Sequence, residues 1–574
     1  MPVQNAEVAA VFSEIADLLE IEGANPFRIR AYRNAARTVG ELGRSVATLV
    51  AQGADLDALP GIGADLAAKI AEIVPTGRCA LLERLRKELP AGITELLKVP
   101  GLGPKRVQAL HHELGVQTLE QLHRAAREGR VQSIPGFGAK TQQAILDAAA
   151  ARLHQERRVP LAAAAQTAES LLAALAAVPG VERAVAAGSL RRRRETVGDL
   201  DLLVTTKGAS PVVERFVAGE DVRQVLARGA TRASVVLRSG LQVDLRAVPA
   251  QSFGAAWLYF TGSKAHNIAL RRLAQERGLK INEYGVFKGS ERVAGATEES
   301  VYRAVGLRFI EPELREDRGE LDAARLGRLP QLVQLGDLRG DLHVHTSESD
   351  GRDTIEAMAA AAREHGLSYL AITEHSRRLA MARGVDAARL ARQIDKIDRF
   401  NARAQGFTLL KGVEVDILED GTLDLPDSIL KRLDLVVGAV HHRLDLPRAT
   451  QTERLLRAMD NRHFTVLAHP TGRLMDERPA YAIDLLRVLR KARERGCFVE
   501  LNAQPQRLDL DDTACQMAKA EGVLVSINSD AHSTLEFDDL QLGIGQARRG
   551  WLEKGDVLNT RSLDELRPLL ARTM

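Results

Sequence analysis

Between residues 341 and 530, short apolar segments alternate with longer stretches of helical pattern. Each segment is rich in valine, leucine and isoleucine and is flanked by polar turns. The segments are 341–345, 369–375, 409–415, 435–441, 465–469, 498–502 and 524–530. Regular alternation of strand and helix favours a parallel sheet covered by helices. Seven units predict a distorted barrel, similar to the eight-unit barrel with one unit missing, over residues 337–574.

Six of these seven strands end in or near a side chain that can bind a metal ion. His343 and His345 alternate along one strand, so both project from the same face. In parallel barrels the functional groups gather at the carboxyl ends of the strands. The candidate metal ligands are His343, His345, Asp350, His375, Glu414, His441, His469, Asp530 and His532. This set could hold two or three divalent transition metals, with Mn²⁺ or Zn²⁺ expected and Fe²⁺ also open, and such ions activate water and clamp phosphate oxygens.

A single histidine is more often a satisfied structural residue than a ligand, so the ordered set carries the argument. His365, His442 and His463 fit the pattern less well and are predicted to be structural, with a ligand role left open for His442 because it lies directly beside His441. The order of Asp-Leu-His-Val-His-Thr, Ser-Asp-Gly, Thr-Glu-His, Gly-Val-Glu, Val-His, Ala-His-Pro and Ser-Asp-Ala-His resembles the motifs of the PHP (polymerase and histidinol phosphatase) superfamily. The resemblance implies a distorted seven-stranded barrel, a trinuclear metal site with all nine ligand positions filled, and phosphoesterase chemistry.

A second constellation lies in residues 160–315, where strand patterns at 183–188, 199–204, 233–237 and 242–246 mix with helices and predict an α+β region. Asp199 and Asp201 alternate on one strand, so their carboxylates point the same way. Asp244 could add a third carboxylate from a neighbouring strand. Three carboxylates can hold two Mg²⁺ ions, which favour oxygen ligands and substrate phosphates. These three are the candidate catalytic residues, for attack by a hydroxyl on a triphosphate.

Two further motifs accompany the carboxylates: Gly188-Ser-Leu-Arg-Arg192 before them and Tyr259-Phe-Thr-Gly-Ser263 after them. A glycine turn lets backbone N–H groups approach phosphate, and arginine binds its oxygens. The ordering resembles family X DNA polymerases. The resemblance implies a nucleotide pocket made of Ser189, Arg192, Tyr259, Phe260, Gly262, Asn267 and Arg271. Gln242 departs from the family, because eukaryotic relatives tend to carry arginine there, which could alter how Asp244 is tuned.

Three Pro-Gly-x-Gly turns, at residues 60–63, 100–103 and 135–138, each precede a helical stretch, and residues 1–155 show no convincing strand pattern. Such turns let the backbone approach a phosphate while the next helix presents its N–H groups. One turn alone is usually just a helix connection. Three, followed by lysines at 69, 105 and 140, predict helix-hairpin-helix contacts to the DNA backbone through Gly61, Gly63, Gly101, Gly103, Gly136 and Gly138.

Lys69 lies where the family carries a Schiff-base lysine, so it is either a 5′-deoxyribose-phosphate lyase nucleophile or a DNA contact. Asp65 stands one turn away and would keep the amine protonated, which favours the contact.

Together the patterns predict a multidomain chain with an all-α N-terminal region, an α+β nucleotidyltransferase part and a C-terminal (βα)7 barrel. The expected boundaries are 1–80 (lyase-like helix-hairpin-helix domain), 81–155 (fingers-like region), 156–250 (palm), 251–315 (thumb), 316–336 (linker) and 337–574 (PHP domain). The net charge of +3 over 574 residues does not by itself argue for nucleic acid. Three scattered cysteines fit a reducing cytoplasm, and no apolar run reaches the roughly 18–20 residues that span a bilayer. The family resemblance implies a bacterial protein at the nucleoid. We also expect a monomer that does not bind membranes.

The predicted function is repair of short gaps by template-directed addition of dNTPs to gapped or primed DNA, with a metal-dependent 3′→5′ exonuclease in the barrel. Abasic-site cleavage and cleaning of blocked 3′ ends stay open for the barrel. Two other classes are weighed against this. A DNA-binding scaffold with decayed sites is disfavoured by the intact carboxylates and ligands. A small-molecule nucleotidyltransferase fused to a phosphatase is disfavoured by the three hairpins.

Overall fold

The computed structural model describes residues 5–42, 45–88, 93–97, 99, 101–154, 158–208, 210–475 and 477–573. The chain folds into two compact units, residues 1–158 and 159–574, and each is described by itself. Pro100 of the second predicted hairpin lies outside the described residues. Among the described residues, no helix combines the length and the apolar character needed to cross a membrane.

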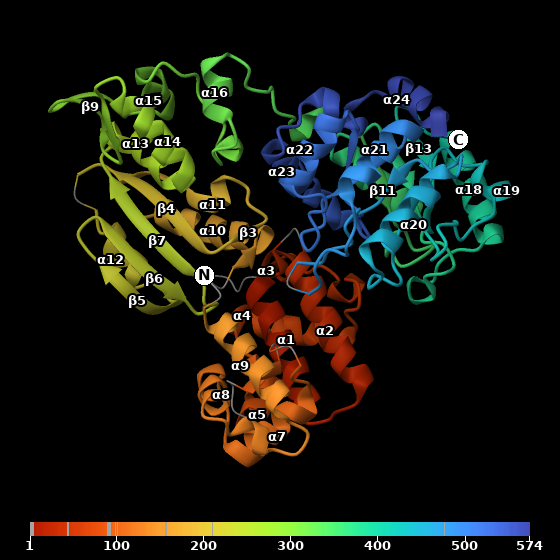
Figure 1. Cartoon of the computed structure of the whole chain (residues 1–574), viewed down its shortest axis with the longest axis horizontal. Helices are drawn as coiled ribbons and strands as arrows, with labels where there is room; N and C mark the ends of the chain where they lie inside the picture. The colour runs from red at the N-terminus through yellow and green to blue at the C-terminus, as the bar shows by residue number, and fades with distance from the viewer. Residues whose placement is uncertain are drawn as a thin grey trace. The chain divides into compact units, whose positions relative to one another are not determined.

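The first unit is helical throughout its described residues, as predicted (Figure 1). Its helices are α1 (Asn5–Ile21), α2 (Pro26–Glu41), α3 (Val46–Ala51), α4 (Ala64–Thr76), α5 (Ala80–Glu88), α6 (Thr94–Leu97), α7 (Pro104–Leu114), α8 (Leu119–Arg127) and α9 (Ala139–His154). The three hairpin turns share one burial pattern. Each buries the apolar residues that flank its first glycine, which are Leu59 and Ile62, Val99 and Leu102, and Ile134 and Phe137. The glycines are thereby left at the surface.

The second unit begins with a mixed five-stranded sheet, here called the palm sheet, in the order β2-β4-β7-β6-β5. Its strands are β2 (Val181–Ala186), β4 (Asp199–Thr206), β5 (Val222–Arg228), β6 (Arg232–Leu237) and β7 (Gln242–Val248). The helices α10 (Leu161–Ala176), α11 (Gly188–Arg191) and α12 (Val212–Val217) accompany it, with the short pair β1 (Val159–Pro160) and β3 (Thr196–Val197). The four strands predicted from the sequence are present. The edge strand β5 was missed because most of its residues are exposed and it lacks an apolar alternation.

Helices α13 (Phe253–Thr261), α14 (Lys264–Gln275) and α15 (Glu298–Ala304) follow, with the small sheet β8 (Lys280–Asn282), β9 (Gly285–Lys288) and β10 (Glu291–Ala294). A short helix, α16 (Glu320–Arg325), lies in the predicted linker, as expected.

The C-terminal region holds two parallel sheets, β11-β12-β13 and β14-β15-β16-β17-β18. The strands are β11 (Gly340–Val344), β12 (Tyr369–Ile372), β13 (Thr408–Lys411), β14 (Glu414–Asp416), β15 (Val437–Ala439), β16 (Val466–Leu467), β17 (Phe498–Asn502) and β18 (Val525–Asn528). Isolated parallel bridges connect the two sheets: Val344 of β11 pairs with Ala531, just after β18, and His375, just after β12, pairs with Glu414 of β14. This is the arrangement of a distorted barrel that opens into two sheets.

The helices of this region are α17 (Ile355–Glu364), α18 (Ala387–Asn401), α19 (Asp427–Leu430), α20 (Arg448–Asp460), α21 (Leu485–Arg495), α22 (Asp512–Glu521), α23 (Leu540–Arg549) and α24 (Leu563–Leu570). One predicted strand is broken in two. Segment 409–415 forms β13 and β14 with Gly412 between them, where an added Cβ would lie 2.7 Å from the Thr373 side chain. Glu414 therefore begins a strand instead of ending one.

Candidate metal centres

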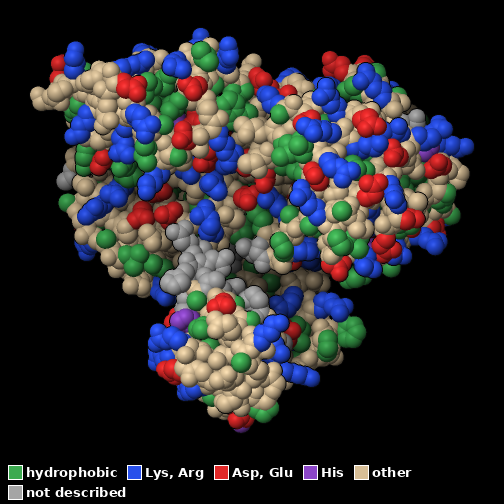
Figure 2. All heavy atoms as spheres, viewed as in Figure 1, with side chains coloured by type: hydrophobic (Ala, Val, Ile, Leu, Met, Phe, Trp, Pro, Cys, Tyr) green, Lys and Arg blue, Asp and Glu red, His purple; other side chains and the backbone are tan. Residues whose placement is uncertain are grey.

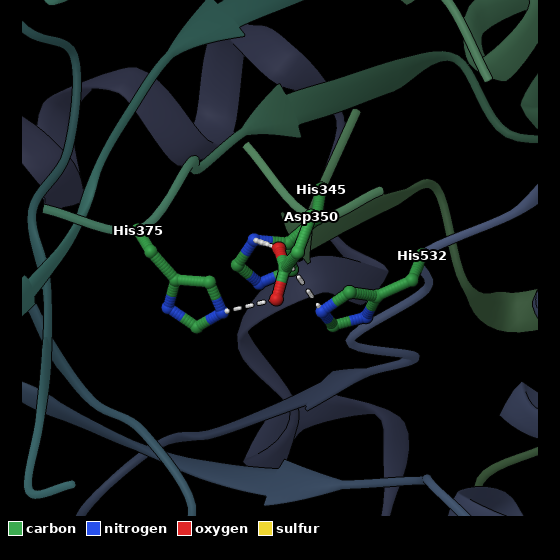
Figure 3. Close-up of side chains that lie close together, drawn as sticks. All are labelled: His345, Asp350, His375 and His532. Atoms are coloured by element: carbon green, nitrogen blue, oxygen red, sulfur yellow. Dashed lines mark ion pairs between the residues drawn. The ribbon is translucent and has the colours of Figure 1, made fainter. Parts of the chain in front are cut away.

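Three histidines converge on Asp350 in the C-terminal region, and Figure 3 shows their rings around the carboxylate. Asp350 lies 3.3 Å from His375 Nε2 and 3.5 Å from His532 Nε2. The third contact, to His345 Nδ1, is 3.9 Å. These residues come from the loops that follow β11, β12 and β18, so the cluster forms where the strands end.

A second group surrounds Glu414, at the start of β14. Its carboxylate lies 2.6 Å from His375 Nδ1, 3.3 Å from His441 Nε2 and 3.0 Å from His469 Nε2. His375 therefore connects the Asp350 and Glu414 groups. The side chain of Glu414 is almost fully buried, which only charge compensation makes tolerable.

Asp530 completes the cluster from the segment after β18. Its Oδ1 lies 3.1 Å from His345 Nε2 and 3.6 Å from His343 Nε2. All nine predicted ligands are thus brought into one continuous cluster. Eight of the nine fall into three sets whose ligand atoms lie within 4.8 Å of one another: His345, Asp350, His375 and His532; His343, His345 and Asp530; and His375, Glu414 and His441. His469 joins the cluster through its contact with Glu414.

Several buried polar atoms of this cluster make no hydrogen bond within the described part of the chain: His343 Nε2, both ring nitrogens of His345, and Glu414 Oε2. Buried polar atoms are rarely left unsatisfied. Here they face other ligand atoms, so the donor set fits divalent cations. His469 and Asp530 also have positive φ angles of 25° and 53°, an uncommon conformation for non-glycine residues that recurs at functional sites.

Two groups of the cluster, Glu414 and His345, have the charge state that metal binding needs. Burial favours a neutral Glu414, but the neighbouring His375 and His441 hold its pKa well below the usual value, so it stays a carboxylate. Burial, together with His532 and His375, lowers the pKa of His345 to about 3. Its imidazole is therefore neutral near pH 7, the form that binds metals.

Two carboxylates that contact the predicted ligands from behind were not predicted from the sequence. Glu500 on β17 lies 2.7 Å from His343 Nδ1, and Asp416 lies 3.1 Å from His441 Nδ1. Such partners fix the ring orientation and raise the basicity of a ligating imidazole. A signal was present: β17 is the one strand without a predicted ligand, yet Glu500 and Asn502 alternate on it among apolar residues and are buried.

The palm carboxylates occupy adjacent parallel strands. In the register of β4 and β7, Asp201 lies opposite Asp244, and Asp199 lies opposite Gln242. Burial, with Asp199 and Asp244 nearby, raises the pKa of Asp201 to about 7. A carboxylate so placed is destabilised by its neighbours until a cation compensates it, so these residues fit Mg²⁺. Among the described residues, the oxygens of this trio do not all lie within the 4.8 Å found in the histidine sets.

Both oxygens of Asp244 are held by protein groups. Gln242 Nε2 donates to one oxygen at 2.9 Å, and the hydroxyl of Ser234 donates to the other. The departure from the family pattern at position 242 therefore does touch Asp244. A neutral amide orients this carboxylate without the charge that an arginine would bring.

The turn before β4 packs against Asp201. Gly188 has a φ of +60°, and a Cβ built on it would lie 2.2 Å from Asp201 Oδ2. Ser189 Oγ is buried and has no hydrogen-bond partner within the described residues. Arg192 is engaged inside the protein: its Nε donates to Glu316 at 3.0 Å and its Nη1 donates to the carbonyl of Thr261.

The other predicted nucleotide-pocket residues lie on α13 and α14 and in the turn between them, where Gly262 has a φ of +71°. The rings of Tyr259 and Phe260 meet edge to face, with centroids 5.3 Å apart. Asn267 Nδ2 donates to the carbonyl of Tyr259 at 2.7 Å, which leaves its buried Oδ1 without a partner among the described residues. Arg271 Nε donates to the carbonyl of Asn267 at 3.3 Å. These side chains are therefore close together and partly pre-positioned.

The hairpin glycines have the geometry that close phosphate approach needs. Gly61, Gly101 and Gly136 have φ angles of +67°, +86° and +86°. Gly63 and Gly103 are the N-caps of α4 and α7 and carry no side-chain cap. Their carbonyls accept from Leu66 and Arg106, so an earlier N–H group of each helix, such as that of Lys105, is left for another acceptor. Gly138 precedes α9, and a Cβ built on it would meet nothing within 4 Å.

Lys69 lies on α4, and its Nζ donates to Asp65 Oδ1 at 2.5 Å. Partial burial lowers the pKa of this amine, but Asp65 and Tyr32 outweigh burial and raise it. A raised pKa keeps the amine protonated at neutral pH. The predicted ion pair is present, and it disfavours a nucleophilic role.

The chain is 39% identical to the DNA polymerase/3′-5′ exonuclease PolX of Bacillus subtilis over 570 residues, which cover 99% of each protein. It belongs to the PolX-type family X DNA polymerases. The matched family descriptions agree along the chain: helix-hairpin-helix domain at residues 3–79, SAM-like helix-hairpin-helix tandem at 93–151, DNA polymerase beta thumb at 256–316 and PHP domain at 341–504.

More distant relatives match parts of this PolX-type chain. A probable phosphatase of Thermoanaerobacter sp. (strain X514) is 29% identical over 231 residues, or 38% of this chain and 89% of that protein. DNA polymerase lambda of Rattus norvegicus is 29% identical over 290 residues, or 45% of this chain and 48% of that protein. Each of these relatives matches less than half of this chain.

Proposed function

We propose that the protein fills short gaps in DNA with the palm sheet and trims 3′ ends with the PHP region. One observation carries this proposal: a single chain holds two metal-binding constellations of different chemistry. The palm offers only carboxylates, which suit Mg²⁺, whereas the C-terminal cluster mixes imidazoles with carboxylates, which suits Mn²⁺ or Zn²⁺. The likeness to PolX over nearly the whole chain supports both proposed activities, gap filling and 3′-end trimming.

In the palm, Asp199, Asp201 and Asp244 would hold Mg²⁺, which would favour attack of a primer 3′-hydroxyl on the α-phosphate and neutralise the triphosphate. The buried, unpartnered Ser189 Oγ supports a role in binding phosphate oxygens. Tyr259 and Phe260 would line the sugar and base pocket. The remaining pocket residues are assigned to the nucleotide as well: Arg192, Gly262, Asn267 and Arg271.

In the PHP region the nine clustered residues would hold two or three divalent metals, which supply activated water and charge stabilisation for phosphodiester hydrolysis. The chain's own contribution is to orient the rings. Glu500 and Asp416 fix His343 and His441 through their Nδ1 atoms. The imidazole of His345 stays neutral, so metal binding does not first have to remove its proton.

The polymerase assignment is tested by extension of a primer across a one-nucleotide gap with Mg²⁺ and dNTPs. Asp201→Asn keeps the shape of the side chain and removes its charge, so extension should fall by at least about a hundredfold while DNA binding persists. Glu214→Gln is a matched control, since Glu214 is exposed on α12 and pairs only with Arg228 among the described residues. Normal extension by Asp201→Asn would overturn the assignment.

The nuclease assignment is tested on a 3′-ended strand with Mn²⁺. The double variant His343→Ala/His345→Ala should lose degradation and retain extension. His365→Ala is the matched control, because His365 pairs with Asp538 outside the cluster, 3.1 Å away. Degradation that persists in the double variant, after repurification, would place the nuclease site elsewhere.

We further propose that the hairpins hold the DNA backbone on either side of a gap and that a downstream 5′-phosphate increases the rate. The exposed hairpin glycines and the exposed Lys105 and Lys140 support this. Figure 2 shows lysine and arginine side chains interspersed with acidic ones on the visible side of each unit, so we assign the DNA contacts to the hairpins themselves. Equal rates with and without the 5′-phosphate would contradict the proposal. Sedimentation of the free protein tests the expected monomer.

A further inference from the structure

A helix of the PHP region reaches the glycine turn of the polymerase site. Within the second unit, α23 ends beside residues 188–193, the turn that carries Ser189 and Arg192 (Figure 1). Gln546 Nε2 donates to the carbonyl of Arg193 at 2.7 Å, and Arg549 Nη1 donates to the carbonyl of Arg192 at 2.8 Å. The last two carbonyls of the turn are therefore held by the PHP region.

The same helix also reaches the side chain of Arg192 through one shared carboxylate. Glu316 accepts from Arg192 Nε at 3.0 Å and from Arg549 Nη1 at 2.9 Å. The other terminal nitrogen, Arg549 Nη2, donates to Asp512 Oδ2 at 2.6 Å. Both arginines and Glu316 are largely buried, so water screens these charges little. A buried carboxylate shared by two guanidinium groups constrains the orientation of both.

Arg193 shows why the turn needs support. Its φ is +57°, a left-handed conformation that costs a non-glycine residue roughly 1–2 kcal/mol. Its side chain packs on Gly545, where an added Cβ would lie 3.3 Å from Arg193 Cβ. Contacts from α23 thus lie against the strained residue itself, and strain of this kind persists only where the surroundings impose it.

We propose that Gln546 and Arg549 of the PHP region are positioning residues for the polymerase: they fix the turn that binds the triphosphate of the incoming dNTP. The inference rests on the proposed polymerase function and assigns part of its nucleotide affinity to the exonuclease region. If the proposal is correct, losing either α23 donor weakens dNTP binding. The nine clustered residues should be unaffected, because neither Gln546 nor Arg549 touches any of them through a described contact.

Two conservative variants separate this role from general stability. Gln546→Met keeps the length of the side chain and removes the donor to Arg193. Arg549→Lys keeps the charge beside Glu316 and Asp512 and loses the fork that also reaches the carbonyl of Arg192. Arg318→Ala is the matched control, because Arg318 Nη1 pairs with the same Asp512 Oδ2 at 3.0 Å and makes no described contact with the turn.

The measurement is equilibrium binding of the complementary dNTP, with Mg²⁺, to the full-length protein on a gapped DNA. The primer ends in a dideoxynucleotide on a phosphorothioate linkage, so that neither extension nor trimming interferes. Gln546→Met should weaken dNTP binding by about tenfold at most, the scale of losing one neutral hydrogen bond, and Arg549→Lys by about tenfold or more, because the bond that it loses is charge-assisted. In gap filling this appears as a higher KM with kcat less affected. Arg318→Ala should bind as the wild type does.

Three results would overturn the inference. The first is wild-type dNTP affinity in both α23 variants. The second is a parallel fall in Tm, nuclease rate and dNTP affinity, which would indicate a structural role only. In the third, the wild-type protein itself fails to bind the dNTP; this result overturns the proposed polymerase function and the inference with it, and so differs from the first two.

Discussion

The contact between Gly188 and Asp201 gives the sharpest test of the polymerase site. In Gly188→Ala, the new Cβ would lie 2.2 Å from Asp201 Oδ2, 3.1 Å from its Cγ and 3.3 Å from its Cβ. Unstrained carbon contacts lie at about 3.5–4.0 Å, so Cγ and Cβ of Asp201 must shift by a few tenths of an ångström, and the reacting oxygen Oδ2 must move by about 1 Å. A displacement of that size in a reacting group costs about a hundredfold in rate.

The substitution also strains the backbone, because Gly188 has a φ of +60°. A matched variant isolates that component. Gly208→Ala lies at a φ of +73° just after β4, and its Cβ would meet nothing within 4 Å. Both variants carry the left-handed strain of roughly 1–2 kcal/mol, and only Gly188→Ala displaces a catalytic carboxylate.

The assay is single-turnover insertion of one dNTP into a gapped substrate with Mg²⁺, beside Mn²⁺-dependent trimming of the same strand. Gly188→Ala should insert about a hundred times more slowly than Gly208→Ala, with trimming equal in the two. Insertion rates within threefold of each other, at equal Tm, would refute the link between this turn and Asp201.

Three other substitutions probe the rest of the chain. Glu500→Gln should raise the Mn²⁺ concentration for half-maximal nuclease activity by about 10–100-fold, because the charge that contacts His343 Nδ1 is lost. Gap filling should stay unchanged. An unchanged Mn²⁺ requirement would show that Glu500 is dispensable. Borohydride on an incised abasic substrate should trap no adduct, because the raised pKa of Lys69 keeps its amine protonated; an adduct that disappears in Lys69→Ala would establish a lyase instead. Gly438→Ala on β15 should lower the free energy of unfolding of the C-terminal region by about 1–3 kcal/mol, because the new Cβ would lie 2.1 Å from the Phe464 ring. A thermal melting curve that matches the wild type would contradict this.

The cluster of histidines and carboxylates could be predicted from the sequence, because in a parallel barrel a ligand-type residue at a strand end is by itself a sufficient signal. Parallel strands deliver their carboxyl ends to one face, so a ligand at a strand end needs no knowledge of its partner. His345 and Asp530 are 185 positions apart in the sequence, and both still lie with His375 in the predicted cluster. The palm pair Asp199 and Asp201 was predictable in the same way, from alternation on one strand.

The features that the sequence did not reveal depend on contacts between segments that are far apart in the chain. The strand break at Gly412 follows from its fit against Thr373, which no local pattern shows. Glu500 has the period of an inward-facing strand residue, but its partner His343 lies 157 positions away. Arg192 carried a recognisable nucleotide-binding pattern, and its Glu316 contact could not be read from that pattern.

The two catalytic regions also share a hydrophobic core, which decides how their activities can be separated. Leu508 and Leu542 of the PHP region are buried in the same cluster as the palm leucines and valines. At the edge of this core, Arg473 Nη2 donates to Glu195 Oε2 at 2.7 Å. Cutting the chain at 316–336 would expose the palm side of that core and leave Glu195 without this partner, as well as removing the α23 donors from the glycine turn. A palm fragment that fails to extend primers would therefore say nothing about its carboxylates, whereas point variants such as Gly188→Ala keep the core intact and report on the site alone.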